Sequence, residues 1–287
     1  MKLVTYRLDD AEHIGALTED GAGVLPLSAP DMNTLIETMS LTDLRSAVAA
    51  AERGSVLALA DVELLAPIPC PRQDVICLGM NYRDHAAESA RYSADAFTKD
   101  SAAAVYFSKR VSEAGAPDGV IPRHAGLTDR LDYEAELAVV LGKAARDVRA
   151  ADAADYIFGY MVLNDVSARD LQTGHKQWYF GKSLDGFTPM GPVLVTADEI
   201  AYPPALEIAS HVNGELRQKS NTALLITSIG AVIEELSAGM TLLPGTIIAT
   251  GTPAGVGMGF DPPKFLQSGD VVECTIEGIG TLRSTVV

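Results

Sequence analysis

The stretch between Tyr133 and Gly142 constrains the fold of this chain more than any other. It reads Tyr133-Glu134-Ala135-Glu136-Leu137-Ala138-Val139-Val140-Leu141-Gly142. In a β-strand the odd-numbered side chains would form a wholly apolar face, while the even-numbered face begins with two carboxylates and ends in alanine and valine. A strand that is apolar on both faces towards one end is typical of a sheet covered on both sides. We therefore predict a central strand here, buried between two layers.

The two glutamates of this strand predict a bound cation. Glu134 and Glu136 would lie on one side with α-carbons about 6.6 Å apart, and like charges that close in a buried place are unfavourable unless a cation lies between them. A Glu-x-Glu pair alone more often marks a solvated edge. A second apolar strand pattern at residues 156–163, however, ends at Asp165. Three carboxylates together favour Mg²⁺, Mn²⁺ or Ca²⁺ over zinc.

Charge and composition narrow the class of protein. The chain has 287 residues and a formal net charge of -16, which argues against nucleic acid and anionic membrane surfaces as partners. Its three cysteines are odd in number and unpatterned, and its first residues lack a secretion signal, so we expect a cytoplasmic globular protein. A divalent ion and a few lysines would still allow small anionic substrates, because they reverse the charge locally.

The chain divides at a proline-rich connector, residues 65–71. We predict a small N-terminal α+β domain over residues 1–66 and a catalytic domain over residues 67–287. The smaller part shows strand patterns and then helical patterns with Asp31 and Thr42 as caps: residues 2–8, 13–18, 22–27, Met32–Met39 and Thr42–Arg53. The larger part is β-rich, with a hairpin signal at Asn213-Gly214 and an amphipathic helix near residues 224–238. This pattern favours an α+β fold over a doubly wound one.

Three further segments carry chemistry. If residues 84–90 are helical, His85 and Glu88 share one face, and a carboxylate beside an imidazole makes a good general-base pair. Lys182 lies in a glycine-flanked apolar loop, and residues 250–257 form a glycine-rich turn whose N–H groups can approach an anion. Each pattern alone also fits a surface helix, a solvated lysine or a plain turn.

Five motifs in order resemble the fumarylacetoacetate hydrolase family. They are Asn81-Tyr82-x-x-His85-x-x-Glu88, Tyr133-Glu134-x-Glu136, Asn164-Asp165 through Gln172, Gly181-Lys182-Ser183-x-Asp185 and Gly251-Thr252-Pro253-x-Gly255-Val256-Gly257. The resemblance covers roughly residues 70–287 and is closest to short members of the acylpyruvase and 2-hydroxyhepta-2,4-diene-1,7-dioate isomerase type. It implies a β-rich mixed β-sandwich roll for the catalytic domain, and a homodimer.

The resemblance also implies roles for single residues. Glu134, Glu136 and Asp165 would hold Mg²⁺ or Mn²⁺, and His85 with Glu88 would activate a water molecule. Lys182 would stabilise negative charge. The residues expected to contact the substrate are Gln172, Thr252 and Lys109. The chain departs from the family near Lys109, where Arg110 replaces a common proline, and again at Thr246, where aspartate is common.

The reaction that this implies is hydrolysis of a carbon–carbon bond in a 1,3-diketo, acylpyruvate-type 2-oxo acid. The acid would bind the ion through its carboxylate and keto oxygens, and residues 86–104 would suit a lid. Decarboxylation of oxaloacetate and isomerisation or tautomerisation of a 2-hydroxydienoate use the same electron sink and stay open. A catalytically silent metal-stabilised binding protein is a further alternative from a different class.

Overall fold

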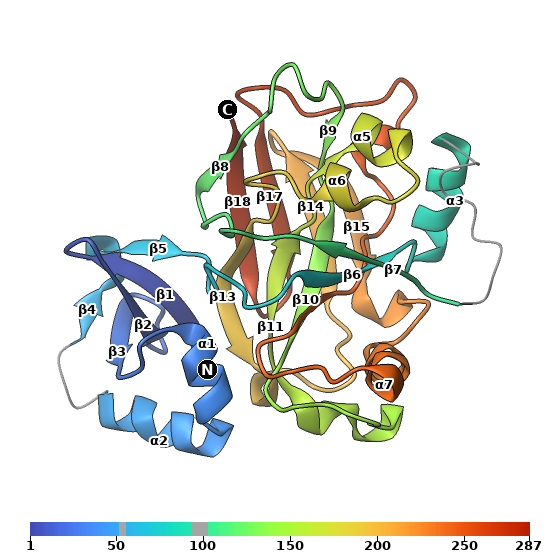
Figure 1. Cartoon of the computed structure of the whole chain (residues 1–287). Helices are drawn as coiled ribbons and strands as arrows, with labels where there is room; N and C mark the ends of the chain where they lie inside the picture. Colours follow the sequence, from blue (N-terminus) through green and yellow to red (C-terminus); the bar gives the residue numbers. More distant parts are fainter. Residues whose placement is uncertain (52–55, 93–102) are drawn as a thin grey trace.

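The computed structural model describes residues 1–51, 56–92 and 103–287. Two sheets dominate it, one of eleven strands and one of five, with a two-stranded pair beside them (Figure 1). The helices are α1 (Met32–Thr38), α2 (Leu41–Ala51), α3 (Arg83–Tyr92), α5 (Arg169–Gly174), α6 (Tyr179–Lys182) and α7 (Ile229–Gly239). No helix of the described ranges is long and apolar enough to cross a bilayer.

The first lobe of the molecule extends the large sheet. Its strands are β1 (Lys2–Leu8), β2 (Ala11–Leu17), β3 (Gly23–Leu27), β4 (Leu57–Ala58) and β5 (Glu63–Leu65). β1 pairs with β13 (Met190–Thr196) of the larger part, with Leu3 opposite Leu194. Leu3 and Leu35 pack in one apolar core with Ala138 and Val140, so the two parts share a core. The division at residue 66 stays a prediction.

Of the two predicted helix caps, the one for α1 is confirmed and the one for α2 is wrong. Asp31 accepts a hydrogen bond from the Thr34 N–H at 2.7 Å and caps α1, as predicted. Thr42 was the wrong cap for α2, because the helix already begins at Leu41. The Ser40 hydroxyl oxygen accepts from the Asp43 N–H at 3.2 Å and satisfies the first turn instead.

The predicted central strand forms β10 (Ala135–Leu141), and every residue in it is buried. It runs between β11 (Ile157–Asn164) and β16 (Ile247–Ala249) in the large sheet, which continues through β6 (Val75–Gly79) and β7 (Val105–Lys109). Leu137 and Val139 pack into the core on one side, whereas Ala138 and Val140 pack into the core on the other. The expectation of a sheet covered on both faces is confirmed.

The five-stranded sheet covers one face of β10 and β11 (Figure 1). In order its strands are β15 (Glu215–Asn221), β14 (Glu207–Val212), β17 (Val271–Ile276), β18 (Gly280–Val286) and β8 (Gly119–Ile121). Asn213-Gly214 joins β14 to β15 with φ angles of 51° and 78°, which is the predicted hairpin turn. Beside the sheets, β9 (Leu131–Asp132) pairs with β12 (Ser167–Ala168).

Two predicted helical segments correspond to helices α7 and α3, with different agreement at their ends. The helix expected over residues 224–238 begins later, at Ile229, because Ser228 caps α7 and residues 222–224 form a separate 3₁₀ turn. Helix α3 includes the predicted residues 84–90. The first part of the expected lid, residues 86–92, lies in this helix, whereas residues 93–102 lie outside the described part of the chain.

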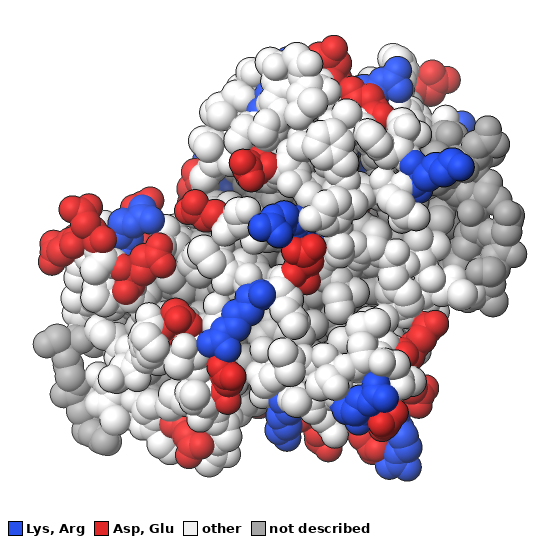
Figure 2. All heavy atoms as spheres, viewed as in Figure 1, with Lys and Arg blue, Asp and Glu red and all other residues white. Residues whose placement is uncertain are grey.

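Acidic and basic side chains are scattered over the face of the molecule seen in Figure 2, which is mostly uncharged. Among the described residues this face shows no continuous basic stripe. Such a stripe is the usual electrostatic footprint of nucleic-acid binding. This face therefore gives no support to a nucleic-acid partner.

The cap of α7 gives a direct test of the corrected helix start. Ser228→Ala should lower the free energy of unfolding by about 1 kcal/mol, because the Ser228 hydroxyl accepts from the Ala231 N–H. Urea unfolding followed by circular dichroism measures it. Ser268→Ala, at an exposed turn, is the matched control. Equal losses in the two variants would contradict the assigned cap.

Candidate active site

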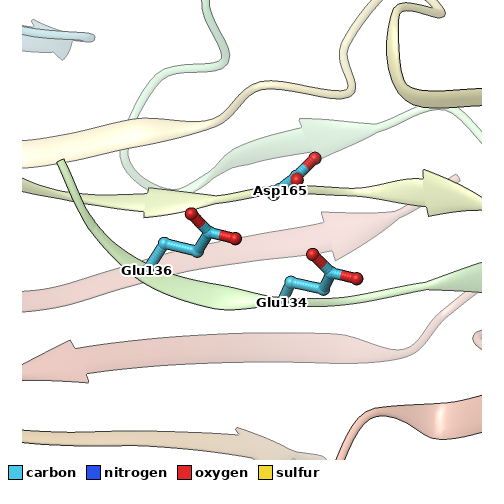
Figure 3. Close-up of side chains that lie close together, drawn as sticks. All are labelled: Glu134, Glu136 and Asp165. Atoms are coloured by element: carbon cyan, nitrogen blue, oxygen red, sulfur yellow. The ribbon is translucent and has the colours of Figure 1, made fainter. Parts of the chain in front are cut away.

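The pairing of β10 with β11 brings three carboxylates together. Glu134 precedes β10, Glu136 lies in it, and Asp165 follows β11, whose end runs antiparallel to the start of β10. The Asp165 N–H donates to the Glu134 carbonyl at 2.9 Å, which fixes the register. Ligand oxygens of all three side chains lie within 4.8 Å of one another, and all three residues are buried. Figure 3 shows the carboxylates of Glu134 and Glu136 projecting to the same side of the strand, with Asp165 nearby.

Buried cations surround two of these acids. Lys182 Nζ donates to Glu134 Oε2 at 2.9 Å and to Asp165 Oδ2 at 2.8 Å. Lys109 Nζ donates to Asp165 Oδ1 at 2.5 Å and to the Val166 carbonyl at 3.0 Å. Lys109 was predicted to contact the substrate; the structure places its ammonium group, fully buried, against the Asp165 carboxylate, and the substrate contact stays a prediction.

Glu134 gains a second cationic partner from the start of α5. Arg169 Nη1 lies 2.6 Å from Glu134 Oε1, so each oxygen of Glu134 faces a positive charge. Burial alone would raise the pKa of Glu134, but Lys182 and Arg169 outweigh it and hold that pKa well below its usual range. Asp165 likewise has a lysine at each oxygen.

Glu136 is the acid whose negative charge is least compensated. Its Oε2 accepts from the Gly251 N–H at 2.8 Å, and among the described residues no ion pair to it is found. Burial raises its pKa well above the usual value, and the neighbouring charges of Asp165 and Glu134 raise it further. A divalent cation would relieve this repulsion, because it favours the ionised form of all three acids. Carboxylate oxygens keep a second lone pair, so those bonded to lysine can still bind an ion. The residues therefore fit an oxygen-ligated divalent metal.

His85 and Glu88 form a close pair on α3. His85 Nδ1 lies 3.3 Å from Glu88 Oε2, and both side chains are buried. The Gly255 N–H donates to both oxygens of Glu88, at 3.0 and 3.2 Å. This hydrogen bond joins α3 to the glycine-rich turn, which is defined here as residues 251–259. The pair can orient the imidazole for proton transfer.

One cavity joins these groups. The space in it that a water molecule can occupy is about 10 Å³, close to what one water needs. Its polar lining residues are His85, Glu134, Arg169, Gln172, Lys182 and Thr252. Its apolar wall consists of Leu78, Met80, Phe107, Trp178 and Met258, with Gly79. Of the predicted site residues, Glu136, Asp165, Glu88 and Lys109 are not part of this lining. Glu88 pairs with His85, Asp165 bonds to Lys182 and Lys109, and Glu136 bonds to Gly251.

The glycine-rich turn is held by hydrogen bonds from the sheet. Thr252 Oγ1 donates to the Ala135 carbonyl at 2.9 Å and accepts from Gln218 Nε2 at 2.8 Å. Gly251 has a φ of +97°, and a Cβ there would lie 2.8 Å from Asn81 Cβ, so glycine is required. The turn therefore has a fixed position at the cavity, and Thr252 presents its side chain to it.

Sequence reasoning gave no role to three buried polar residues that build the site: Arg169, Asp132 and Gln218. Arg169 lies inside the motif from Asn164 to Gln172, and Asp132 directly precedes Tyr133-Glu134. A charged residue next to a buried strand was the available signal for both. Gln218 carried no such signal, because it lies in a strand of mixed polarity.

Comparison with known proteins identifies the family. The family model described as "Fumarylacetoacetate (FAA) hydrolase C-terminal" matches residues 74–287. The oxaloacetate tautomerase YisK of Bacillus subtilis is 49% identical over 236 residues, covering 82% of this chain and 77% of that protein.

Solved structures agree over the full length. A fumarylacetoacetate hydrolase from Exiguobacterium antarcticum superposes with a TM-score of 0.84 and 39% identity, covering 100% of this chain and 99% of the other. A 2-hydroxyhepta-2,4-diene-1,7-dioate isomerase from Mycobacterium marinum gives 0.75 and 35%, covering 100% and 98%. The expected sheet-rich α+β fold and the resemblance drawn from the five motifs are confirmed. The chain belongs to the fumarylacetoacetate hydrolase family.

Proposed function

We propose that this protein is a divalent-metal-dependent enzyme that tautomerises oxaloacetate or a similar short 2-oxo dicarboxylic acid. The observation that carries the proposal is a single cavity lined by His85, Arg169 and Glu134, where Glu134 belongs to a buried cluster of three carboxylates that could hold a metal ion. The similarity to an oxaloacetate tautomerase supports the same reaction.

Glu134, Glu136 and Asp165 would hold the metal, for which we propose Mg²⁺ or Mn²⁺. When bound, such an ion supplies positive charge that makes the C3 protons of a 2-oxo acid more acidic. Lys182, between Glu134 and Asp165, adds a fixed positive charge on the same side of the cavity. Its own pKa is raised, since the two carboxylates outweigh burial, so it stays protonated.

Arg169 is suited to bind the distal carboxylate of the substrate. Its Nη2 is buried and has no hydrogen-bond partner among the described residues, although the other two nitrogens are bonded. An unpaired guanidinium N–H in a cavity favours an anionic ligand oxygen. The Gln172 side chain lines the same wall, where its Oε1 accepts from Arg169 Nη1 at 3.0 Å.

His85 would move the proton. Glu88 faces Nδ1, so Nε2, which lies 3.4 Å from Ser89 Oγ, is the nitrogen available for exchange with a ligand. In the keto-to-enol direction the imidazole takes a proton from C3 and returns a proton to the C2 oxygen. Glu88 stabilises the imidazolium formed in between. The reaction is therefore balanced without a co-reactant.

Hydrolysis of an acylpyruvate is the second candidate. The His85–Glu88 pair favours it specifically, because such a pair can also deprotonate a water molecule. The water oxygen would attack the remote carbonyl, the carbon–carbon bond would break, and C3 would take up a proton. Oxaloacetate decarboxylation and 2-hydroxydienoate isomerisation stay open alternatives, and a silent metal-stabilised binding protein would lack all of these activities. The sandwich-roll description, a cytoplasmic location and a homodimer also remain proposals.

Substrate and metal can be tested together. The protein with Mg²⁺ should accelerate equilibration of keto and enol oxaloacetate, read from enol absorbance, and EDTA should abolish the acceleration until Mg²⁺ is restored. Acetylpyruvate and fumarylpyruvate are assayed in parallel. Cleavage of these alone would establish the hydrolase, and loss of carbon dioxide from oxaloacetate the decarboxylase. Rates unchanged by EDTA would reject the metal mechanism, and metal stabilisation without turnover would indicate a binding protein.

Two substitutions separate metal binding from proton transfer. His85→Ala should lower kcat by about 10²–10⁴-fold while the increase in Tm caused by Mg²⁺ is kept, since His85 contacts none of the three ligands by hydrogen bond. Glu136→Gln should remove both the activity and the increase in Tm caused by Mg²⁺, because it takes one ligand from the ion. Activity assays and thermal unfolding with and without Mg²⁺ measure the two effects.

Exposed residues of the same types provide the controls. His13→Ala and Glu19→Gln, both in the N-terminal lobe, should change neither activity nor metal response. Full activity in His85→Ala would rule out its assigned role. An unchanged Mg²⁺ response in Glu136→Gln would place the metal elsewhere.

A further inference from the structure

Asp132 is a fully buried carboxylate that the reaction above does not use. It lies in β9, two residues before Glu134, and its two oxygens accept four N–H groups. Oδ1 accepts from the Tyr133 N–H at 2.9 Å and the Gly257 N–H at 2.6 Å. Oδ2 accepts from the Met258 N–H at 2.9 Å and Arg169 Nε at 2.8 Å. One side chain therefore joins the glycine-rich turn to the arginine of the cavity.

The orientation of Arg169 follows from this contact. Asp132 holds Nε on one edge of the guanidinium, while Glu134 and Gln172 hold Nη1. The remaining nitrogen, Nη2, is the one without a partner among the described residues. A planar guanidinium bonded at two positions cannot rotate, so the direction of the third is fixed.

The same carboxylate also determines where the turn lies relative to Glu88. A Cβ on Gly257 would come within 2.6 Å of Asp132 Oδ1, and one on Gly259 within 2.0 Å of Glu88 Oε1. The turn thus packs closely between two carboxylates, one on the side of Arg169 and one on the side of His85. The spacing between the arginine and the imidazole depends on both contacts.

We propose that Asp132 is a positioning residue that fixes Arg169 and the glycine-rich turn together, so that Arg169 Nη2 reads the distal carboxylate of a dicarboxylic acid. The substrate class in this inference rests on the proposed function. Asp132 is the residue that would set the preference of the enzyme for dicarboxylic acids. Asp132 itself does not touch the substrate. Its effect is transmitted through Arg169, and it selects for acids that carry a second carboxylate.

The test compares two stable ligands, malate and lactate, which share a 2-hydroxy acid end. Malate carries the distal carboxylate on C3, whereas C3 of lactate is a methyl group without a carboxylate. Calorimetric titration of the full chain with Mg²⁺ gives both dissociation constants. The wild type should bind malate more tightly than lactate. If it binds both equally, the distal carboxylate is not recognised and the proposal is wrong.

Asp132→Asn is the main variant. The amide has the size of the carboxylate, but whichever way it is turned, its NH₂ group faces an N–H that the carboxylate now accepts. The dissociation constant of malate should rise about tenfold or more, as for a lost charge-assisted hydrogen bond, and that of lactate should stay within about twofold. An equal loss for both ligands, or no loss for malate, would overturn the proposal.

Asp170→Asn is the matched control, because it removes the same negative charge from the residue next to Arg169 in the sequence. Asp170 bonds to Thr128 and the Asp129 N–H, outside the cavity. It should leave both dissociation constants unchanged. Arg169→Gln should raise the malate constant alone, and the double variant with Asp132→Asn should be no worse than the worse single variant. Additive losses would contradict action through Arg169.

If Asp132→Asn fails to fold, a second variant tests the same proposal. Gly257→Ala keeps the carboxylate and displaces the turn from it, so it should also weaken malate more than lactate; an equal effect on both would count against the proposal. Turnover of oxaloacetate by the wild type is measured separately. An inactive wild type with the predicted malate preference, lost in Asp132→Asn, would reject the tautomerase and retain the positioning role.

Discussion

The site depends on balancing buried charge at one end of β10. Glu134, Glu136, Asp165 and Asp132 bring four acids into the interior, and Lys109, Lys182 and Arg169 bring three bases. Ionised groups are costly to bury unless each has partners. The acids outnumber the bases, and Glu136 is the acid without a basic partner among the described residues. Burial raises the pKa of Glu136, and the neighbouring acids raise it further. The three acids of the candidate metal site could therefore hold one divalent cation, which would offset this surplus of negative charge.

The two layers that cover β10 exclude water from its charged side chains, so the balance of buried charge is not screened. β10 is buried on both faces, so water cannot screen its carboxylates as it would at an open sheet edge. The same burial keeps Lys182 and Arg169 close to the acids, with little freedom to move. A ligand entering the small cavity meets side chains that are already oriented, which is what a proton transfer with defined geometry requires.

The glycine-rich turn links the two ends of the cavity. It donates to Glu88 from Gly255, to Glu136 from Gly251 and to Asp132 from Gly257. These three carboxylates belong to the His85–Glu88 pair, the candidate metal site and the contact that orients Arg169. A backbone segment without side chains at these positions can approach all three. Its glycines predicted N–H groups that can approach an anion, and in the structure these N–H groups bond to carboxylates of the protein itself.

Local sequence determined the elements on which the site stands. Alternation along residues 133–142 predicted the buried strand, and the spacing of His85 and Glu88 predicted their contact on one helical face, because both depend on periodicities of a few residues. The sequence placed the three carboxylates of the candidate metal site near strand ends, and the structure brings them together. The start of α7 was missed, since an apolar pattern does not show where a serine cap ends the preceding turn.

Only the tertiary structure decided how distant residues meet. Asp132 reaches Gly257 and Arg169, and Gln218 reaches Thr252, across separations that no local pattern encodes. The pairing of Lys109 with Asp165, where a substrate contact was expected, arose in the same way. Hydrogen-bond partners of buried polar groups depend on which strands pack together. Local patterns placed Glu134, Glu136 and Asp165 at buried strand ends, whereas the burial of Arg169 and Asp132, and the pairing of all these charges, followed from how the strands pack.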